Sequence, residues 1–119
     1  MIKEIDSNKT FIETKNVVVS VIINCFNGEM YLKEAIESVC NQDFKDWEII
    51  FWDNQSTDSS AEIVLHFNDP RIKYFYSESH DKLGMARQKA VEKATGEFIA
   101  FLDCDDYWLP NKLETQVIT

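Results

Sequence analysis

Three carboxylates follow a short apolar run near the C-terminal end of this chain. Residues 98–102 are apolar throughout, and Asp103, Asp105 and Asp106 come directly after them. Like charges this close repel one another, so a proton or a bound cation has to relieve them. Hard divalent cations such as Mg²⁺ and Mn²⁺ prefer oxygen ligands and often join one or two carboxylates to substrate phosphates. The pattern therefore indicates either a site for a metal and a diphosphate or a solvated acidic turn.

Two earlier loops carry side chains that could bind a nucleotide. Phe26 and Asp53 each follow an apolar stretch, and Arg87 lies in a later helical segment. The ring of Phe26 could stack on a base, Asp53 could accept a hydrogen bond from a base N–H, and Arg87 could reach a phosphate. Each residue also has a simpler interpretation, as a packing aromatic, a turn residue and a solvated or paired arginine, respectively.

Alternating strands and helices must hold these loops in place. Apolar stretches predict four strands, the last of them buried on both faces, at residues 17–23, 47–52, 72–76 and 98–102. Helical periodicity lies at residues 31–40, 59–67 and 85–95. This order predicts an α/β fold with a mostly parallel sheet and helices on both faces. The loops after the first, second and fourth strands then converge if those strands are neighbours.

Local signals mark several helix ends. Ser59 and Glu62 form a capping-box pattern for the second helix. Gly96 is expected at the C-terminal cap of the third helix, and Pro110 in the first turn of a last helix.

Composition restricts the class of protein. A chain of 119 residues makes one small domain, and its net charge of −9 argues against nucleic acid as a partner. Cys25, Cys40 and Cys104 form no Cys-x-x-Cys motif, so we expect reduced thiols and a cytoplasmic protein. No apolar stretch approaches the roughly 18–20 residues of a membrane span. Attachment to the inner face of a membrane would therefore depend on segments that this sequence lacks.

Taken together, four motifs resemble the start of an inverting family 2 glycosyltransferase with the GT-A fold. The matching segments are residues 19–27, 48–58, 86–88 and 96–106, with Trp108 and Pro110 after them. The resemblance implies that residues 17–119 are the Rossmann-like, donor-binding N-terminal half of such a domain. Residues 1–16 would be a flexible arm, and the C-terminal acceptor part would be absent.

The resemblance also implies roles for individual side chains that bind nucleotide. Phe26 and Asp53 would approach the base, Arg87 the nucleotide, and Asp103 the ribose or diphosphate. Asp105 would contact Mn²⁺ or Mg²⁺, with Asp103 as a second candidate ligand.

Asp106 would lie next to the metal site without touching the ion. Asn54 and Gln55 depart from the family, which usually has a second aspartate and a glycine there.

The implied reaction transfers a sugar, with metal assistance and inversion, from a nucleotide-diphosphate sugar to a hydroxyl of a glycan or lipid-linked acceptor. A UDP-sugar is the favoured donor. The carboxylate base that deprotonates the acceptor comes after the metal motif in the family, so we expect no catalytic residue in this chain. One alternative is a truncated nucleotide-binding module without activity, which would self-associate through uncovered apolar surface. Another is a Mg²⁺-dependent receiver-type signalling domain.

Overall fold

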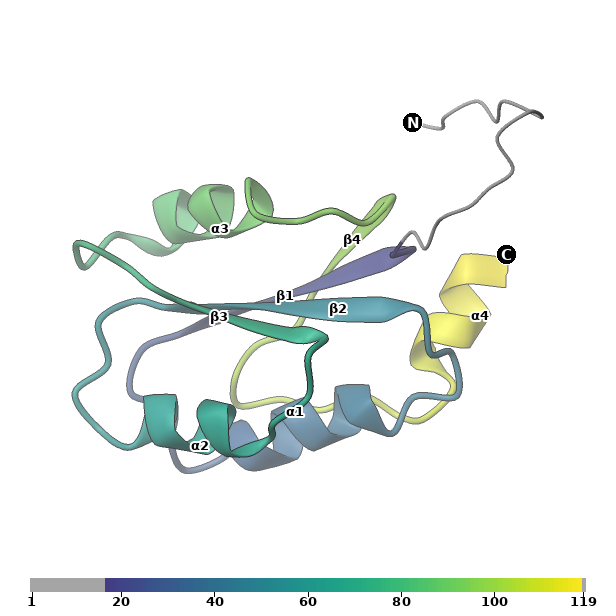
Figure 1. The fold of residues 1–119 in the computed structure, drawn as a ribbon, viewed down its shortest axis with the longest axis horizontal. Coiled ribbons are helices and arrows are strands. Elements are labelled where there is room, and N and C mark those ends of the chain that lie inside the picture. The colour runs from purple at the N-terminus through teal and green to yellow at the C-terminus, as the bar shows by residue number, and fades with distance from the viewer. Residues whose placement is uncertain (1–16, 119) are drawn as a thin grey trace.

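The computed structural model describes residues 17–118, which form a four-stranded sheet with helices on both faces (Figure 1). The strands are β1 (Val19–Cys25), β2 (Trp47–Asp53), β3 (Ile72–Tyr76) and β4 (Phe98–Phe101). The helices are α1 (Leu32–Cys40), α2 (Ser60–His66), α3 (Leu83–Val91) and α4 (Lys112–Ile118). The strand order is β3-β2-β1-β4, and every pair is parallel. The predicted α/β fold is confirmed.

The described part starts at residue 17, so the predicted arm at residues 1–16 lies outside it. None of the helices in residues 17–118 combines the length and the apolar character needed to cross a membrane.

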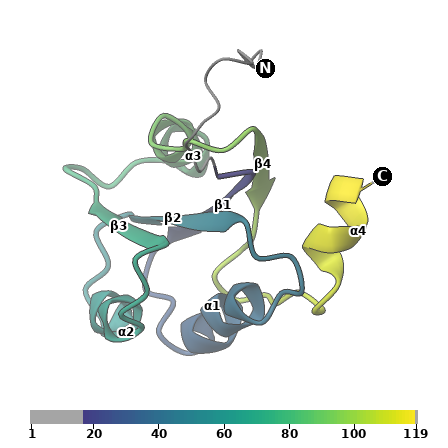
Figure 2. The same ribbon diagram turned by 45° about the vertical axis from the view of Figure 1, so that its right-hand side comes forward.

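Two cores lie on opposite faces of the sheet. Helices α1 and α2 cover one face and α3 covers the other (Figures 1 and 2). Because side chains alternate along a strand, Val21 and Ile23 of β1 join the core under α1 and α2, while Ile22 packs toward α3. On β2, Phe51 belongs to the first core and Trp52 to the second. The two central strands are therefore buried on both faces, as parallel strands usually are.

Strand β4 contradicts the prediction that its apolar run is buried on both faces. Phe98 is 54% exposed, Ile99 39% and Phe101 47%. Within residues 17–118, β4 pairs with β1 alone and forms an edge of the sheet. The prediction was wrong because an apolar run does not reveal whether a neighbouring element covers the strand.

The capping box predicted at Ser59 and Glu62 is not formed. Ser59 makes no side-chain capping bond at the start of α2. Instead, Asp58 Oδ1 accepts a hydrogen bond from the Ser60 N–H at 2.9 Å. Helix α2 begins where the pattern placed it, with Ser59 at the N-cap, but the carboxylate of Asp58 takes the capping role in place of the Ser59 hydroxyl.

A buried carboxylate, Glu48, ties the sheet together. It lies on β2 with 1% of its surface exposed, and it accepts hydrogen bonds from Lys73 Nζ at 2.8 Å, Ser20 Oγ at 2.6 Å and the Thr95 N–H at 2.7 Å. Burial alone would raise the pKa of Glu48, but these hydrogen bonds hold it below its usual value. Gly96 donates to Ser20 Oγ at 2.8 Å, and a Cβ on Gly96 would lie 2.8 Å from that oxygen. Gly96 is therefore a close-approach residue beyond α3, and its prediction as a helix cap was wrong.

The segment before α4 is fixed to the end of α1. Gln42 is fully buried, and its Nε2 donates to the Leu109 carbonyl at 2.7 Å while its Oε1 accepts from the Leu113 N–H at 2.9 Å. The Pro110 carbonyl accepts from the Asp43 N–H at 2.8 Å. Pro110 thus precedes α4, which begins at Lys112. The prediction that Pro110 lies in the first turn of this helix was wrong. The hydrogen bonds hold the turn after β4 close to the sheet.

Candidate functional site

The carboxyl ends of the parallel strands bring several loops to one edge of the sheet (Figure 1). The loops after β1 and β2 bind each other directly. Asn27 Oδ1 accepts from the Thr57 N–H at 2.7 Å, and the Asn27 N–H donates to Ser56 Oγ at 2.8 Å. Asn27 has a φ of 53°, a left-handed conformation that asparagine tolerates. The predicted convergence of these two loops is confirmed, and Ser56 and Thr57 act as turn residues that brace them.

Phe26 stands at this edge, supported by the loop after β3. It is 49% exposed, and its ring packs edge-to-face on His80 with centroids 4.6 Å apart. His80 Nδ1 lies 3.0 Å from the Asn54 carbonyl oxygen. The Asn54 amide in turn pairs with the Asp81 backbone, donating to its oxygen at 2.7 Å and accepting from its N–H at 2.9 Å. An exposed aromatic ring therefore rests on a loop that is itself well fixed.

Asp53 occupies a different place from the one expected. It is fully buried; its Oδ1 accepts from the Ser56 N–H at 2.7 Å and its Oδ2 from the Tyr74 hydroxyl. Burial, together with the hydrogen bond to Asp53, raises the pKa of Tyr74. Asp53 is the last residue of β2 and shares the face of Phe51, which α1 and α2 cover. In this structure Asp53 shapes the loop after β2 and offers no surface to a base.

Arg87 and Asp103 lie together at the α3 side of the edge. Arg87 Nη2 is 3.8 Å from Asp103 Oδ1, and the guanidinium carbon is 5.2 Å from the centroid of the Phe101 ring. Both side chains are open to solvent, at 42% for Arg87 and 69% for Asp103, so the pair contributes little to stability. The guanidinium and the carboxylate therefore remain accessible to a ligand.

Asp105 and Asp106 are exposed in the turn after β4. Asp106 Oδ1 accepts from the Tyr107 N–H at 2.8 Å, and the Asp106 N–H donates to the Asp103 carbonyl at 3.0 Å. The Asp105 carboxylate makes no hydrogen bond or ion pair with residues 17–118. These residues contain no group of three or more His, Cys, Asp or Glu side chains able to enclose a metal. A free carboxylate in this turn nevertheless fits a hard cation that takes most of its ligands from substrate and water.

Cys25 and Cys104 meet between the loops after β1 and β4, a contact that the sequence did not suggest. Their side chains lie close together, and Cys25 Sγ donates to Ser60 Oγ at 3.7 Å. The contact with Cys104 lowers the pKa of Cys25, while the same contact and burial raise the pKa of Cys104. A Cβ on Gly28 would lie 2.8 Å from both sulfurs, so the glycine makes room for the pair.

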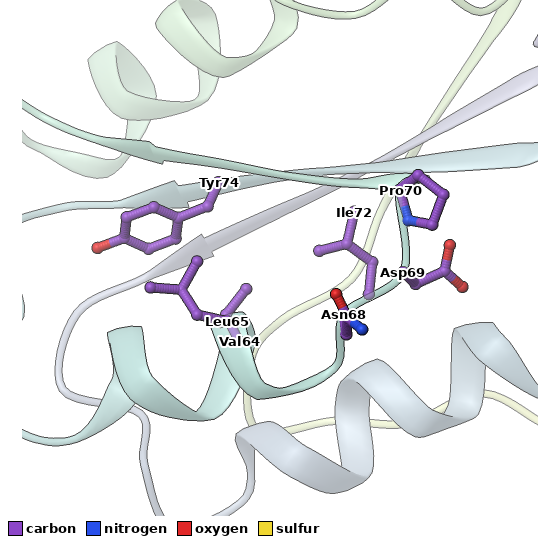
Figure 3. Close-up of a pocket in the computed structure, with 7 residues that line it drawn as sticks. All are labelled: Val64, Leu65, Asn68, Asp69, Pro70, Ile72 and Tyr74. Atoms are coloured by element: carbon purple, nitrogen blue, oxygen red, sulfur yellow. The ribbon is translucent and has the colours of Figure 1, made fainter.

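A pocket of about 300 Å³ lies between α2 and β3, apart from these loops (Figure 3). It is lined by Val64, Leu65, Asn68, Asp69, Pro70, Ile72 and Tyr74. Tyr74 stands at one end and Asp69 and Pro70 at the other. None of the candidate site residues lines this pocket, so the candidate chemistry belongs to the open loop edge.

Comparison with known proteins assigns the chain to a family. Residues 20–118 match the family model described as glycosyl transferase family 2. The chain belongs to this family. It is 41% identical over 100 residues to the UDP-Glc:alpha-D-GlcNAc-diphosphoundecaprenol beta-1,3-glucosyltransferase WfgD of Escherichia coli. That match covers 84% of this chain and 40% of WfgD, so the chain spans well under half the length of this family 2 relative.

Solved structures agree with this assignment. S. aureus TarS (residues 1–349, in complex with UDP) superposes with a TM-score of 0.80 and 31% identity, covering 85% of this chain and 31% of that chain. The mannosyltransferase PcManGT from Pyrobaculum calidifontis, in complex with GDP-Man and Mn²⁺, gives a TM-score of 0.72 at 24% identity and supports the fold. The predicted family and GT-A-like fold are confirmed, and the family assignment argues against a receiver-type signalling domain.

Proposed function

We propose that this chain is the donor-binding part of a glycosyltransferase that uses a nucleotide-diphosphate sugar, with a UDP-sugar as the favoured donor. The sugar would pass, with inversion, to a hydroxyl of a glycan or lipid-linked acceptor. The observation that carries the proposal is the loop edge of this family 2 chain, where Arg87 and Asp103 lie together and the free carboxylate of Asp105 comes two residues after Asp103. The complex of TarS with UDP and the lipid-linked acceptor in the name of WfgD support it.

Four exposed side chains would contact the donor. Phe26 would stack on the base, Arg87 would bind the diphosphate, and Asp103 would lie near the ribose or diphosphate. Asp105 would hold the cation. Asp53, which we expected to touch the base, is assigned a positioning role because both of its oxygens are used within the protein.

A divalent cation suits this acidic edge. Asp105, with Asp103 as the second candidate ligand, would hold Mn²⁺ or Mg²⁺, which when bound neutralises charge on the departing diphosphate. Asp106 would position its neighbour by closing the turn through its bond to the Tyr107 N–H. The chain carries a net charge of −9 and would repel an acidic ligand, so a bound cation would also reduce this repulsion. The same charge argues against nucleic acid as a partner.

The base that deprotonates the acceptor is proposed to lie outside this chain. The aligned part makes up only 40% of WfgD, so a longer protein has room for the acceptor site and its base. This chain alone would then bind donor without transferring sugar. The proposed location is the cytoplasm, at the inner face of a membrane where the acceptor is lipid-linked.

Calorimetric titration of the chain with UDP tests the proposal. We expect binding with Mn²⁺ present, no binding with EDTA, and weaker binding of GDP. Asp105→Ala should weaken Mn²⁺-dependent binding by at least about tenfold, because a metal ligand is lost. Asp43→Ala, which removes an exposed carboxylate from the loop before β2, is the matched control and should bind as the original chain does. Equal UDP binding in EDTA would contradict the metal assignment, and no binding of either nucleotide would contradict the donor site.

A further inference from the structure

Two thiols from different loops meet beneath the candidate site. Cys25 ends β1, and Cys104 lies between Asp103 and Asp105 in the turn after β4. Both sulfurs lie 2.8 Å from the position that a Cβ on Gly28 would occupy, so the two side chains lie close together. Nothing in the proposed donor site uses either thiol.

The pairing of β1 with β4 brings the segments that carry the two thiols side by side. The parallel ladder ends at Ile22↔Phe101, and the Leu102 N–H still donates to the Ile22 carbonyl at 3.0 Å. Cys25 lies three residues beyond Ile22 at the end of β1, and Cys104 lies three residues beyond Phe101 in the turn that follows β4. Because both sulfurs lie 2.8 Å from the same Cβ position on Gly28, they are no more than about 5.6 Å apart, and a disulfide would bring them to about 2.05 Å.

Exposure differs among the three cysteines. Cys25 is 2% exposed and Cys104 is partly exposed, so a small reagent reaches Cys104 first. Cys40 packs at the rim of the core on α1, and no cysteine partner is found for it among residues 17–118. Cys40 therefore serves as an internal control for selective oxidation.

We propose that Cys25 and Cys104 are a reversible redox-modification site whose oxidant is a low-molecular-weight disulfide such as oxidised glutathione. One of the two cysteines, as its thiolate, displaces one half of the reagent as a thiol and forms a mixed disulfide, and the other cysteine then displaces the second half. The S–S bond of the reagent breaks and the Sγ–Sγ bond forms. Both thiol protons and two electrons leave on the two released thiols. Sulfur atoms joined at about 2.05 Å draw the turn of Asp103 and Asp105 toward β1.

Peptide mass spectrometry after oxidation tests the disulfide itself. The chain is incubated with oxidised glutathione, alkylated with N-ethylmaleimide and digested. We expect a Cys25–Cys104 disulfide peptide, alkylated Cys40, and full reversal by dithiothreitol. Cys40→Ser should form the same disulfide and Cys104→Ser should not. Mixed pairings that include Cys40, or glutathione retained on Cys104 without closure, would overturn the proposal.

The effect on ligand rests on the proposed function and is measured separately. We expect the oxidised chain to bind UDP with Mn²⁺ about tenfold more weakly than the reduced chain, because the turn that carries the metal ligand has moved. Dithiothreitol should restore binding. The Cys25→Ser variant should bind UDP with the same affinity whether or not it has been treated with oxidant. A disulfide that leaves UDP affinity unchanged would overturn the regulatory effect alone. A reduced chain that fails to bind UDP would contradict the donor site while the peptide result stood.

Discussion

At the scale of single residues, the loop after β2 depends on a strained backbone at Gln55. Its φ is 69°, a region that glycine adopts freely and that β-branched residues avoid. We expect Gln55→Val to lower the free energy of unfolding by about 1–2 kcal/mol. Gln55→Gly should change it by less than about 1 kcal/mol, because relief of strain offsets the greater freedom of the unfolded chain and the lost bond from Gln55 Nε2 to the Ser77 carbonyl. Urea denaturation of both variants checks this, and equal losses would contradict it.

Arg87 allows the donor site to be tested apart from stability. Its ion pair with Asp103 is long and solvent-exposed, so Arg87→Ala should hardly change the urea midpoint. The same variant should weaken UDP binding by about tenfold, because a charge-assisted hydrogen bond to phosphate is lost. Lys93→Ala, which removes an exposed cation just beyond the C-terminal end of α3, is the control for net charge and should keep the affinity. Similar losses in the two variants would show that the effect is long-range electrostatics.

The sequence predicted which loops carry the candidate site better than it predicted where each side chain points. Polar residues directly after apolar stretches indicated the loops, because strand ends are a local signal. Asp53 was placed in a loop because the strand was predicted to end at residue 52. The structure includes Asp53 in β2, and alternation then turns it toward α1 and α2. The contacts of Phe26 with His80 and of Cys25 with Cys104 join distant segments, so no local pattern contains them.

At the scale of elements, Glu48 links three strands and the segment before β4, and its charge should make stability depend on pH. Glu48→Gln should lower the free energy of unfolding at pH 7 by about 2 kcal/mol, because charged hydrogen bonds to Lys73 and Ser20 are weakened. The folded pKa lies below the usual value, so this contribution is complete above the unfolded pKa of about 4.3 and is lost as pH falls through the folded value. The difference between the two proteins should therefore shrink in acid.

Chemical denaturation from pH 7 down to about pH 3 measures the difference in the free energy of unfolding between the original chain and Glu48→Gln. This difference should be constant above the unfolded pKa of about 4.3 and should shrink below it. Glu97→Gln, at an exposed glutamate just before β4, is the matched control and should change stability little at any pH. A difference for Glu48→Gln that stayed constant through the acid range would show that the Glu48 charge is not what stabilises the sheet.

The sequence predicted the order and type of the elements. The errors in their bounds and burial arise from contacts between segments that are distant in the sequence. Hydrophobic periodicity is local, so the strand and helix positions emerged from it. The first strand, predicted at residues 17–23, runs from Val19 to Cys25 because Asn24 and Cys25 still pair with β2. The close approach of Gly96 to Ser20 and the exposure of β4 depend on neighbours, which no window of sequence contains.

At the scale of the whole molecule, the edge formed by β4 should govern association. Within residues 17–118 its outer side has no paired strand, and Phe98, Ile99 and Phe101 are all partly exposed there. An unpaired, apolar strand edge is a template for pairing with another chain. We therefore expect the chain to self-associate, with an average mass from light scattering that rises with concentration.

A lysine on an edge strand opposes such pairing, because joining two chains would bury its charge. Ile99→Lys should therefore hold the chain monomeric over the concentrations at which the original chain associates. Leu65→Lys makes the same change at a residue of α2 that is 62% exposed and lies away from this edge, so it should associate like the original chain. If only Ile99→Lys became monomeric, association would be assigned to the β4 edge. If both lysine variants became monomeric, the added charge in general would explain the effect. A monomer at every concentration in the unmodified chain would mean that the exposed edge is not adhesive by itself.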